Sequence, residues 1–190
     1  MFSFKGKKTK LNFDNPEVQN NIANYLGKPA DFVYHSPVPF EMGHDAGGGA
    51  DVYIYDETIP VKIYVTGNLI GTKQKKSDAG NYELMICQTV ENKIGPNLIS
   101  KLAYYTLEAS LNSNETLEIG PYAHGNISAV IFDKFAEFEV NGKKLGLLVL
   151  IGITKEELEW KNEYGGEMLI QKLREKSIYP FTVYDRASIV

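Results

Sequence analysis

Residues 147–158 read LLVLIGITKEEL, and this stretch places a strand directly before a helix. The aliphatic run from Leu147 to Ile151 predicts the strand. Thr154, followed three residues later by Glu157, is a capping box, in which the threonine hydroxyl caps the helix and the glutamate reaches back. The chain is therefore expected to pass from a strand to a helix at Thr154.

Strands and a second helical segment surround this stretch. Strands are predicted at 129–132 and 135–140, and Asn141-Gly142 is a strong tight-turn signal before the strand at 147. Downstream, Gly165-Gly166 interrupts the helical pattern, which resumes from Glu167 to about Lys176. The last segment, 179–190, is expected to be extended or irregular.

The N-terminal half adds two helices and further strands. Val18, Ile22 and Leu26 give one apolar face to a helix over 15–26, with Pro16 at its first position. A second helix is predicted over 96–111, and strands over 31–35, 51–55, 61–66 and 82–89. This order favours an α+β fold with helices packed on a mixed, mostly antiparallel sheet. We expect one domain over 15–190, preceded by an N-terminal tail over 1–14.

Composition excludes several classes of protein. The 190 residues carry a formal net charge of −4, whereas a general nucleic-acid binder usually has a basic excess. Cys87 is the only cysteine, so an internal disulfide and a multi-thiolate zinc site are excluded. No apolar run approaches the ~20 residues that span a bilayer, and the start does not resemble a secretory signal. A cytoplasmic protein without a membrane partner is expected.

Catalytic patterns are weak along the chain. His44, Asp45 and Asp51 form the only local cluster of metal-ligand side chains, on a loop whose glycines suggest flexibility. Gly47-Gly48-Gly49 precedes a strand, whereas a phosphate loop follows one, so these glycines indicate a turn with positive φ or the close approach of another chain. Cys87 lies within an apolar strand pattern typical of an inert core thiol. We expect no enzyme, cofactor or metal.

Several segments together resemble the suppressor-of-fused family. They are ADVYIY at 50–55, YVTG at 64–67, YELMI at 82–86, the 148–158 strand and helix start, the helix over 166–173, and Asp185-Arg186. The sequence departs from the pattern after Gly67, where Asn68-Leu69 stands in place of a nearby serine. The resemblance is to short stand-alone bacterial members, which are regarded as immunity proteins or antitoxins. It implies a suppressor-of-fused-like single domain, no catalysis and no cofactor.

The resemblance implies a partner-binding function. The expected partner is a cognate toxin protein, with a basic nuclease domain as one candidate because the chain is acidic. A regulatory protein that binds an endogenous partner is the alternative, and a metal-dependent enzyme using the 44–51 loop is a less favoured one. Polar loops on a rigid scaffold often bind partners, and the candidate binding residues lie on two such loops: Glu41, His44, Asp45 and Asp51 on the first, and Lys73, Lys75 and Lys76 on the second. The sequence leaves the oligomeric state open.

Overall fold

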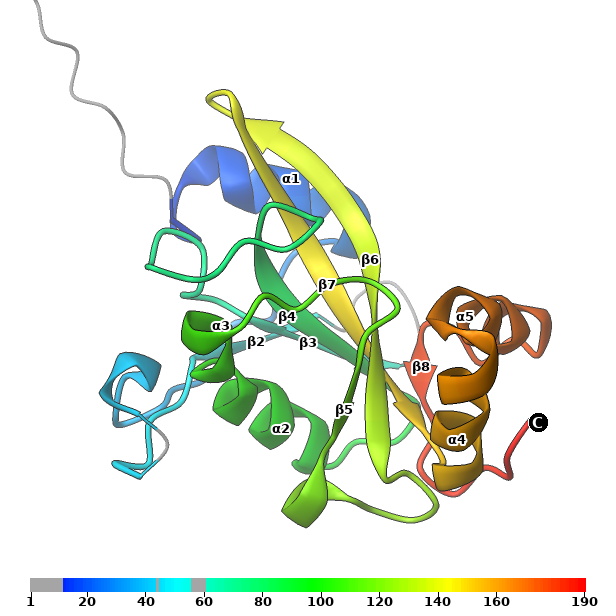
Figure 1. Cartoon of the computed structure of the whole chain (residues 1–190). Helices are drawn as coiled ribbons and strands as arrows, with labels where there is room; N and C mark the ends of the chain where they lie inside the picture. Colours follow the sequence, from blue (N-terminus) through cyan, green and yellow to red (C-terminus); the bar gives the residue numbers. More distant parts are fainter. Residues whose placement is uncertain (1–11, 44, 56–60) are drawn as a thin grey trace, which may run out of the picture.

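A computed structural model describes residues 12–43, 45–55 and 61–190. Its centre is a mixed sheet in which the strands follow the order β1-β2-β3-β4-β7-β6-β5, with β8 beside β4 (Figure 1). The strands are β1 Val33–Tyr34, β2 Val52–Tyr55, β3 Lys62–Thr66, β4 Asn81–Gln88, β5 Thr116–Glu118, β6 Ala129–Val140, β7 Lys143–Ile153 and β8 Phe181–Thr182. The helices are α1 Pro16–Leu26, α2 Ile94–Leu102, α3 Tyr105–Glu108, α4 Lys155–Tyr164 and α5 Gly166–Glu175, with 3₁₀ turns η1 Phe40–Met42 and η2 Gly120–Tyr122.

Most strand pairs are antiparallel. Only β4 with β7 and β4 with β8 run parallel among the described strands. The predicted α+β fold with a mixed, mostly antiparallel sheet is confirmed. The strand-to-helix transition at Thr154 is also confirmed, because β7 ends at Ile153 and the complete capping box of Thr154 and Glu157 opens α4.

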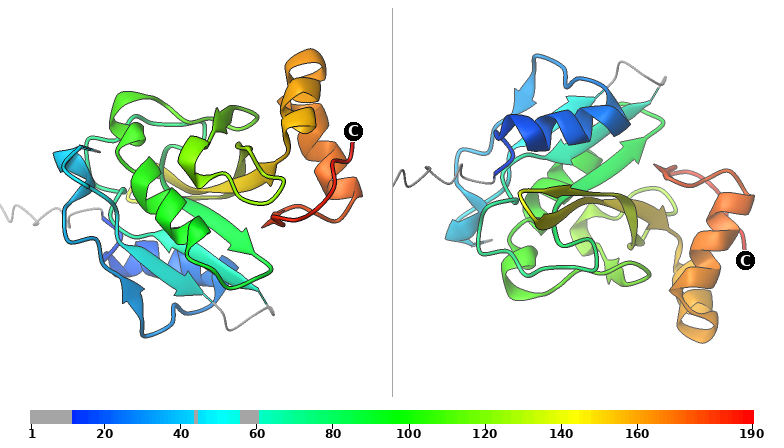
Figure 2. Two further views of the ribbon diagram at one scale, coloured as in Figure 1. Left: turned by 90° about the horizontal axis from the view of Figure 1, so that it is seen from below. Right: turned by 90° about the horizontal axis from the view of Figure 1, so that it is seen from above.

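Helices cover both faces of the sheet (Figure 2). On one face, α1 and α5 pack against side chains such as Met85 and Val149. On the other, α2 packs against Leu84 and Leu148. Neighbouring side chains of a strand point to opposite faces, so β4 and β7 are buried on both sides, which explains their nearly continuous apolar sequence.

The predicted helix over 96–111 is wrong in its extent. The structure has α2, which ends at Leu102, and the separate short α3. At the start of α3, Thr106 N–H bonds to the Ala103 carbonyl three residues back, and the Thr106 hydroxyl donates to the same carbonyl at 2.7 Å. Because these bonds span three residues instead of the four of an α-helix, they interrupt the helix. The apolar pattern of the sequence continues across the interruption.

Two further differences concern the strands and the tail. The strands predicted at 129–132 and 135–140 are one strand, β6, in which Phe135 forms a bulge between Lys134 and Ala136. Phe13 lies within the predicted tail, yet its ring is buried and meets the Tyr53 ring with centroids 4.6 Å apart. The domain boundary itself stays a prediction.

Candidate functional site

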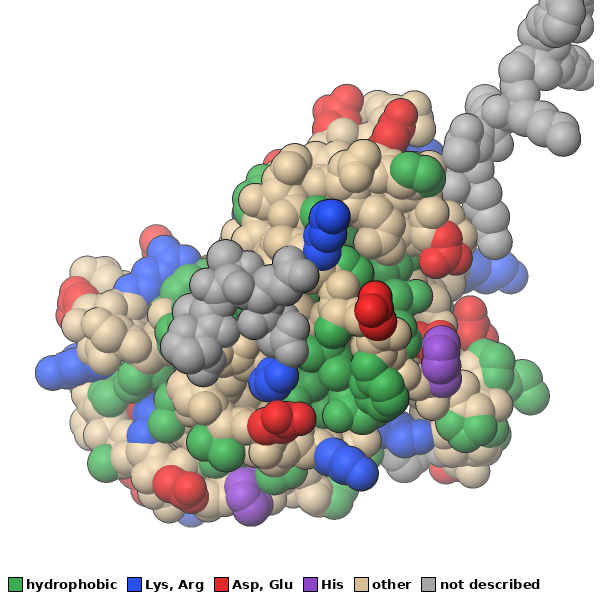
Figure 3. Space-filling model, turned by 180° about the vertical axis from the view of Figure 1, so that it is seen from behind, with side chains coloured by type: hydrophobic (Ala, Val, Ile, Leu, Met, Phe, Trp, Pro, Cys, Tyr) green, Lys and Arg blue, Asp and Glu red, His purple; other side chains and the backbone are tan. Residues whose placement is uncertain are grey.

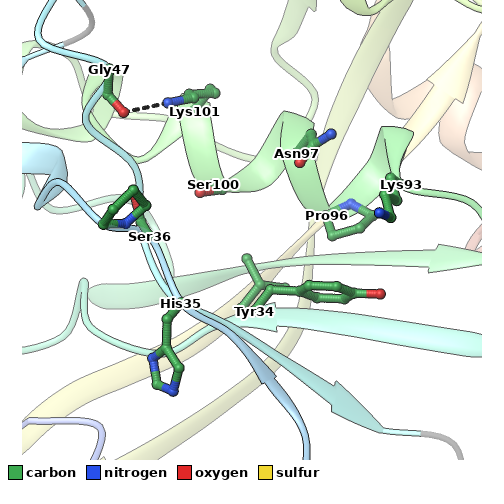
Figure 4. Close-up of a pocket in the computed structure, with 11 residues that line it drawn as sticks. Tyr34, His35, Ser36, Gly47, Lys93, Pro96, Asn97, Ser100 and Lys101 are labelled. Carbon is green, nitrogen blue, oxygen red and sulfur yellow. Dashed lines mark hydrogen bonds between the residues drawn. The ribbon is translucent and has the colours of Figure 1, made fainter.

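A groove of about 350 Å³ lies between β1 and α2 (Figure 4). We call it the β1–α2 groove. Eleven residues line it, among them Tyr34 and Ser36 from β1 and the segment after it, and Lys93, Pro96, Asn97 and Lys101 from α2 and its N-terminal flank. The Pro96 ring faces the Tyr34 side chain across the groove, whereas the His35 imidazole points away from α2. The groove therefore combines an apolar floor with amide and ammonium groups.

The three consecutive glycines hold the loop before β2 close to α2. Gly47 has a φ of 77°, which confirms the predicted turn with positive φ. A Cβ on Gly49 would lie 2.6 Å from the Ser100 hydroxyl oxygen, so any side chain at this position would force Ser100 to shift. Ala50 N–H bonds to the Ser100 carbonyl at 3.0 Å, and the Ser100 hydroxyl returns a 2.7 Å bond to the Ala50 carbonyl.

Lys101 closes one end of the groove. Its ammonium donates to the Gly47 carbonyl at 2.5 Å (Figure 4) and to the Gly48 carbonyl at 3.1 Å. The glycine loop thus presents carbonyl oxygens to a lysine of α2, and no phosphate-binding arrangement of its amides is formed.

Asp51 braces the turn after β1. One carboxylate oxygen accepts from Ser36 N–H at 2.9 Å, and the other lies 3.1 Å from His35 Nδ1. The Asp51 side chain is 27% exposed and that of His35 is 72% exposed. Asp51 was predicted to bind a partner, and in the structure its carboxylate holds the turn after β1 in place beside the groove.

The other predicted residues of the first loop lie beyond this brace. Glu41 is exposed on η1 and Asp45 is exposed in the turn that follows. His44 lies outside the described residues. Gly43 is close to the Tyr104 ring, because a Cβ on it would lie 3.8 Å away. This loop therefore extends from the groove to the junction of α2 and α3.

The second predicted loop reaches that junction from another side. Lys73, Lys75 and Lys76 are exposed, and Lys75 N–H bonds to the Thr106 carbonyl at 2.7 Å. The buried amide of Gln74 fixes the loop to β4 through two bonds with the backbone of Tyr82. The three lysines do not line the groove, so the structure does not unite both loops into one pocket.

A buried carboxylate on β4, Glu83, was not predicted from the sequence. Glu83 on β4 accepts from the Thr66 hydroxyl at 2.7 Å and from the N–H groups of Leu69 and Ile70 at 3.1 and 2.8 Å. Burial raises the pKa of Glu83 to about 8, although these donors act in the opposite direction. Thr66 belongs to the YVTG segment and Glu83 to YELMI, but Leu69 and Ile70 lie between the two segments, so local sequence patterns do not reveal this network.

A second buried carboxylate fixes the C-terminus. Glu157 is fully buried, and Arg186 bonds to both of its oxygens while also donating to the Gly152 carbonyl at 2.9 Å. Ile189 N–H adds a 3.1 Å bond to Glu157. Glu83 and Glu157 thus hold loops and the chain end against the sheet, away from the β1–α2 groove.

The described residues offer little for catalysis. They contain no group of three or more His, Cys, Asp or Glu side chains placed to hold a metal. Cys87 is buried on β4, where burial raises the pKa of its thiol to about 12, which confirms the predicted core position. In the part of the chain that the structure describes, no helix has the length and apolarity to cross a membrane.

An exposed aromatic surface adjoins the groove. Phe32 is 58% exposed, and its ring meets the Tyr34 ring edge-on with centroids 5.0 Å apart. Figure 3 shows hydrophobic side chains gathered on the side of the molecule that is hidden in Figure 1, with charged side chains around them. β1 lies on that side (Figure 2). Such a rimmed apolar patch is typical of a surface that binds another protein.

Comparisons with known proteins agree with one another. The family model described as "Suppressor of fused protein (SUFU)" matches residues 49–187. A crystal structure of a suppressor of fused homologue from Neisseria gonorrhoeae has 16% identity and a TM-score of 0.65, with 90% of this chain and 93% of that chain covered. No curated protein matches the sequence.

Two other solved structures share the fold. The crystal structure of a Sufu–Fu complex has 10% identity and a TM-score of 0.71, with 90% of each chain covered. Drosophila Suppressor of Fused also has 10% identity, with a TM-score of 0.70, and this chain spans half of its length. At these identities the likeness concerns the fold alone.

Proposed function

The chain belongs to the suppressor of fused family, and from that premise we propose that it is a non-catalytic protein-binding module that neutralises a partner toxin. The observation that carries the proposal is the β1–α2 groove with the exposed aromatic surface of Phe32 and Tyr34 beside it. Aromatic side chains with a polar rim are enriched at protein interfaces. The Sufu–Fu complex, which shares this fold, supports a protein as the partner.

The negative charge of the chain favours a toxin whose contacting surface is basic. The chain has a net charge of −4, and Glu41 and Asp45 are exposed on the loop next to the groove. Complementary charge accelerates association and rejects wrong partners. In this proposal Glu41, His44 and Asp45 contact the toxin, Lys73, Lys75 and Lys76 form a second contact at α3, and Asp51 positions the loop.

Co-expression tests this function directly. The toxin gene encoded beside the chain is induced in a host with and without the chain, at matched expression. We expect growth to be rescued by the wild type. Continued cell death with a folded and expressed chain would overturn the antitoxin proposal.

A pull-down separates the toxin from an endogenous partner. Tagged chain is used to capture proteins from its own cells and from cells that lack the neighbouring toxin gene. The antitoxin proposal requires that the main partner disappears in the second sample. A main partner that persists would instead identify a regulatory module.

A further inference from the structure

Building on the proposed protein-binding function, we propose that the β1–α2 groove takes an extended, acidic segment of the partner, which adds as a strand to the free edge of β1 and places a carboxylate beside Lys93. The juxtaposition of an edge strand, the Tyr34 ring and an exposed lysine in one groove, with the exposed Phe32 ring against Tyr34, carries this inference.

The backbone of β1 offers the pairing edge. β1 is the last strand in the sheet order, and among the described strands it pairs only with β2. In an antiparallel ladder, alternate residues point their N–H and C=O groups away from the paired neighbour. Val33 and Tyr34 are adjacent, so one of them directs its backbone groups outward. An extended segment can bond to these groups, as in other cases of strand addition.

Because β1 has only two residues, its backbone hydrogen bonds give a bound segment little affinity. Side-chain contacts must therefore provide most of the binding free energy. Phe32 and Tyr34 form an aromatic surface at this edge, and Pro96 faces Tyr34 across the groove (Figure 4). A volume of about 350 Å³ is at the lower end of the range for ligand pockets. It suits side chains of an inserted segment.

The charge of the groove selects an acidic segment. Lys93 is exposed in this wall, with the exposed Asn97 one helical turn along. Lys101 adds a second ammonium, already oriented by the carbonyls of Gly47 and Gly48. The nearby Asp51 carboxylate is satisfied by Ser36 N–H and His35. The groove is thus locally cationic, although the net charge of the chain is −4. Its lysines would repel a basic segment at this place.

Peptide selection on the intact chain provides the first test. Short random peptides displayed on phage are selected on the immobilised wild-type protein. We expect enriched peptides to contain Asp or Glu among alternating apolar residues. Enrichment of basic or uncharged peptides, or no enrichment, would overturn the proposal.

Charge reversal locates the binding of the selected peptide. Lys93→Glu places an acid at the N-cap of α2, where acids favour helices, so this variant is expected to fold. We expect about tenfold weaker binding, as for loss of one charge-assisted hydrogen bond. Lys176→Glu, an exposed position after α5, makes the same change in net charge and is expected to leave affinity unchanged. Equal weakening in both variants would exclude the groove.

Hydrogen exchange tests the strand addition itself. Binding of the selected peptide should slow amide exchange at 33–34 and leave the opposite edge strand, β5 at 116–118, unchanged. Slowed exchange confined to β5 or to neither edge would contradict the proposal.

The two proposals can fail separately. If Lys93→Glu rescues toxin-expressing cells as well as the wild type, the antitoxin function stands and the groove inference falls. If acidic peptides bind at β1 but no toxin is neutralised, the groove inference stands and the antitoxin function falls.

Discussion

At the scale of single residues, Glu83 makes stability depend on pH. Its pKa is raised from 4.5 to about 8 in the folded chain, so between these values the folded state holds a proton that the unfolded state has lost. The free energy of unfolding should therefore fall as pH rises through this window, by a few kcal/mol. Denaturant unfolding from pH 4 to 9 measures it.

Glu83→Gln provides the comparison. A neutral amide can still accept from Leu69 N–H and Ile70 N–H, so the variant should match the wild type near pH 4.5 and exceed its stability above pH 8. Glu159→Gln, an exposed position on α4, controls for the loss of a carboxylate. Parallel curves for the wild type and Glu83→Gln would show that Glu83 does not titrate in this window.

Arg186 is expected to stabilise the fold through Glu157. Arg186→Met would leave a fully buried carboxylate without its cation, which costs about 3–5 kcal/mol. Glu157→Gln removes that charge and can keep the capping box, because glutamine also serves at this position. Chemical denaturation should find the double variant more stable than Arg186→Met alone. A double variant at least as unstable as the single one would refute this role.

At the scale of elements, the contact between the glycine loop and α2 should depend on the absence of a side chain at Gly49. Gly49→Ala would push the loop away from Ser100 and is expected to cost about 1–3 kcal/mol. Ser100→Ala removes the hydroxyl that the new methyl would meet. A double-mutant cycle by denaturant unfolding should therefore give a combined cost smaller than the sum. Strict additivity would contradict a steric origin.

The elements also show how far the sequence predicts this structure. The capping box at Thr154 and the apolar run before it depend on neighbouring residues, and both were predictable. The short α3 that follows the break after α2 is contacted by a distant loop, because Lys75 N–H bonds to the Thr106 carbonyl, and local periodicity does not contain that contact. The bulge at Phe135 arises from pairing with β7 and was missed for the same reason.

The candidate site was predictable only in part. The glycine run indicated a special backbone before β2, and the structure places it against α2. Tyr34 and Lys93 are 59 residues apart in sequence, and only the antiparallel placement of β1 and the packing of α2 bring them into one groove. Glu83 escaped notice because a lone acid in an apolar strand pattern gives no sign of its partners in the loop before it.

At the scale of the whole molecule, the acidic surface should govern the rate of association with a basic toxin. Glu41→Lys combined with Asp45→Lys changes the exposed loop beside the groove from acidic to basic. Surface plasmon resonance with the captured toxin at low salt should show an on-rate about tenfold slower, and added salt should reduce the difference. Glu159→Lys with Glu163→Lys, both exposed on α4, makes the same change in net charge at another place. If both double variants slow association equally, overall charge explains the rate; a slower rate for the loop variant alone supports the first loop as the surface that meets the toxin.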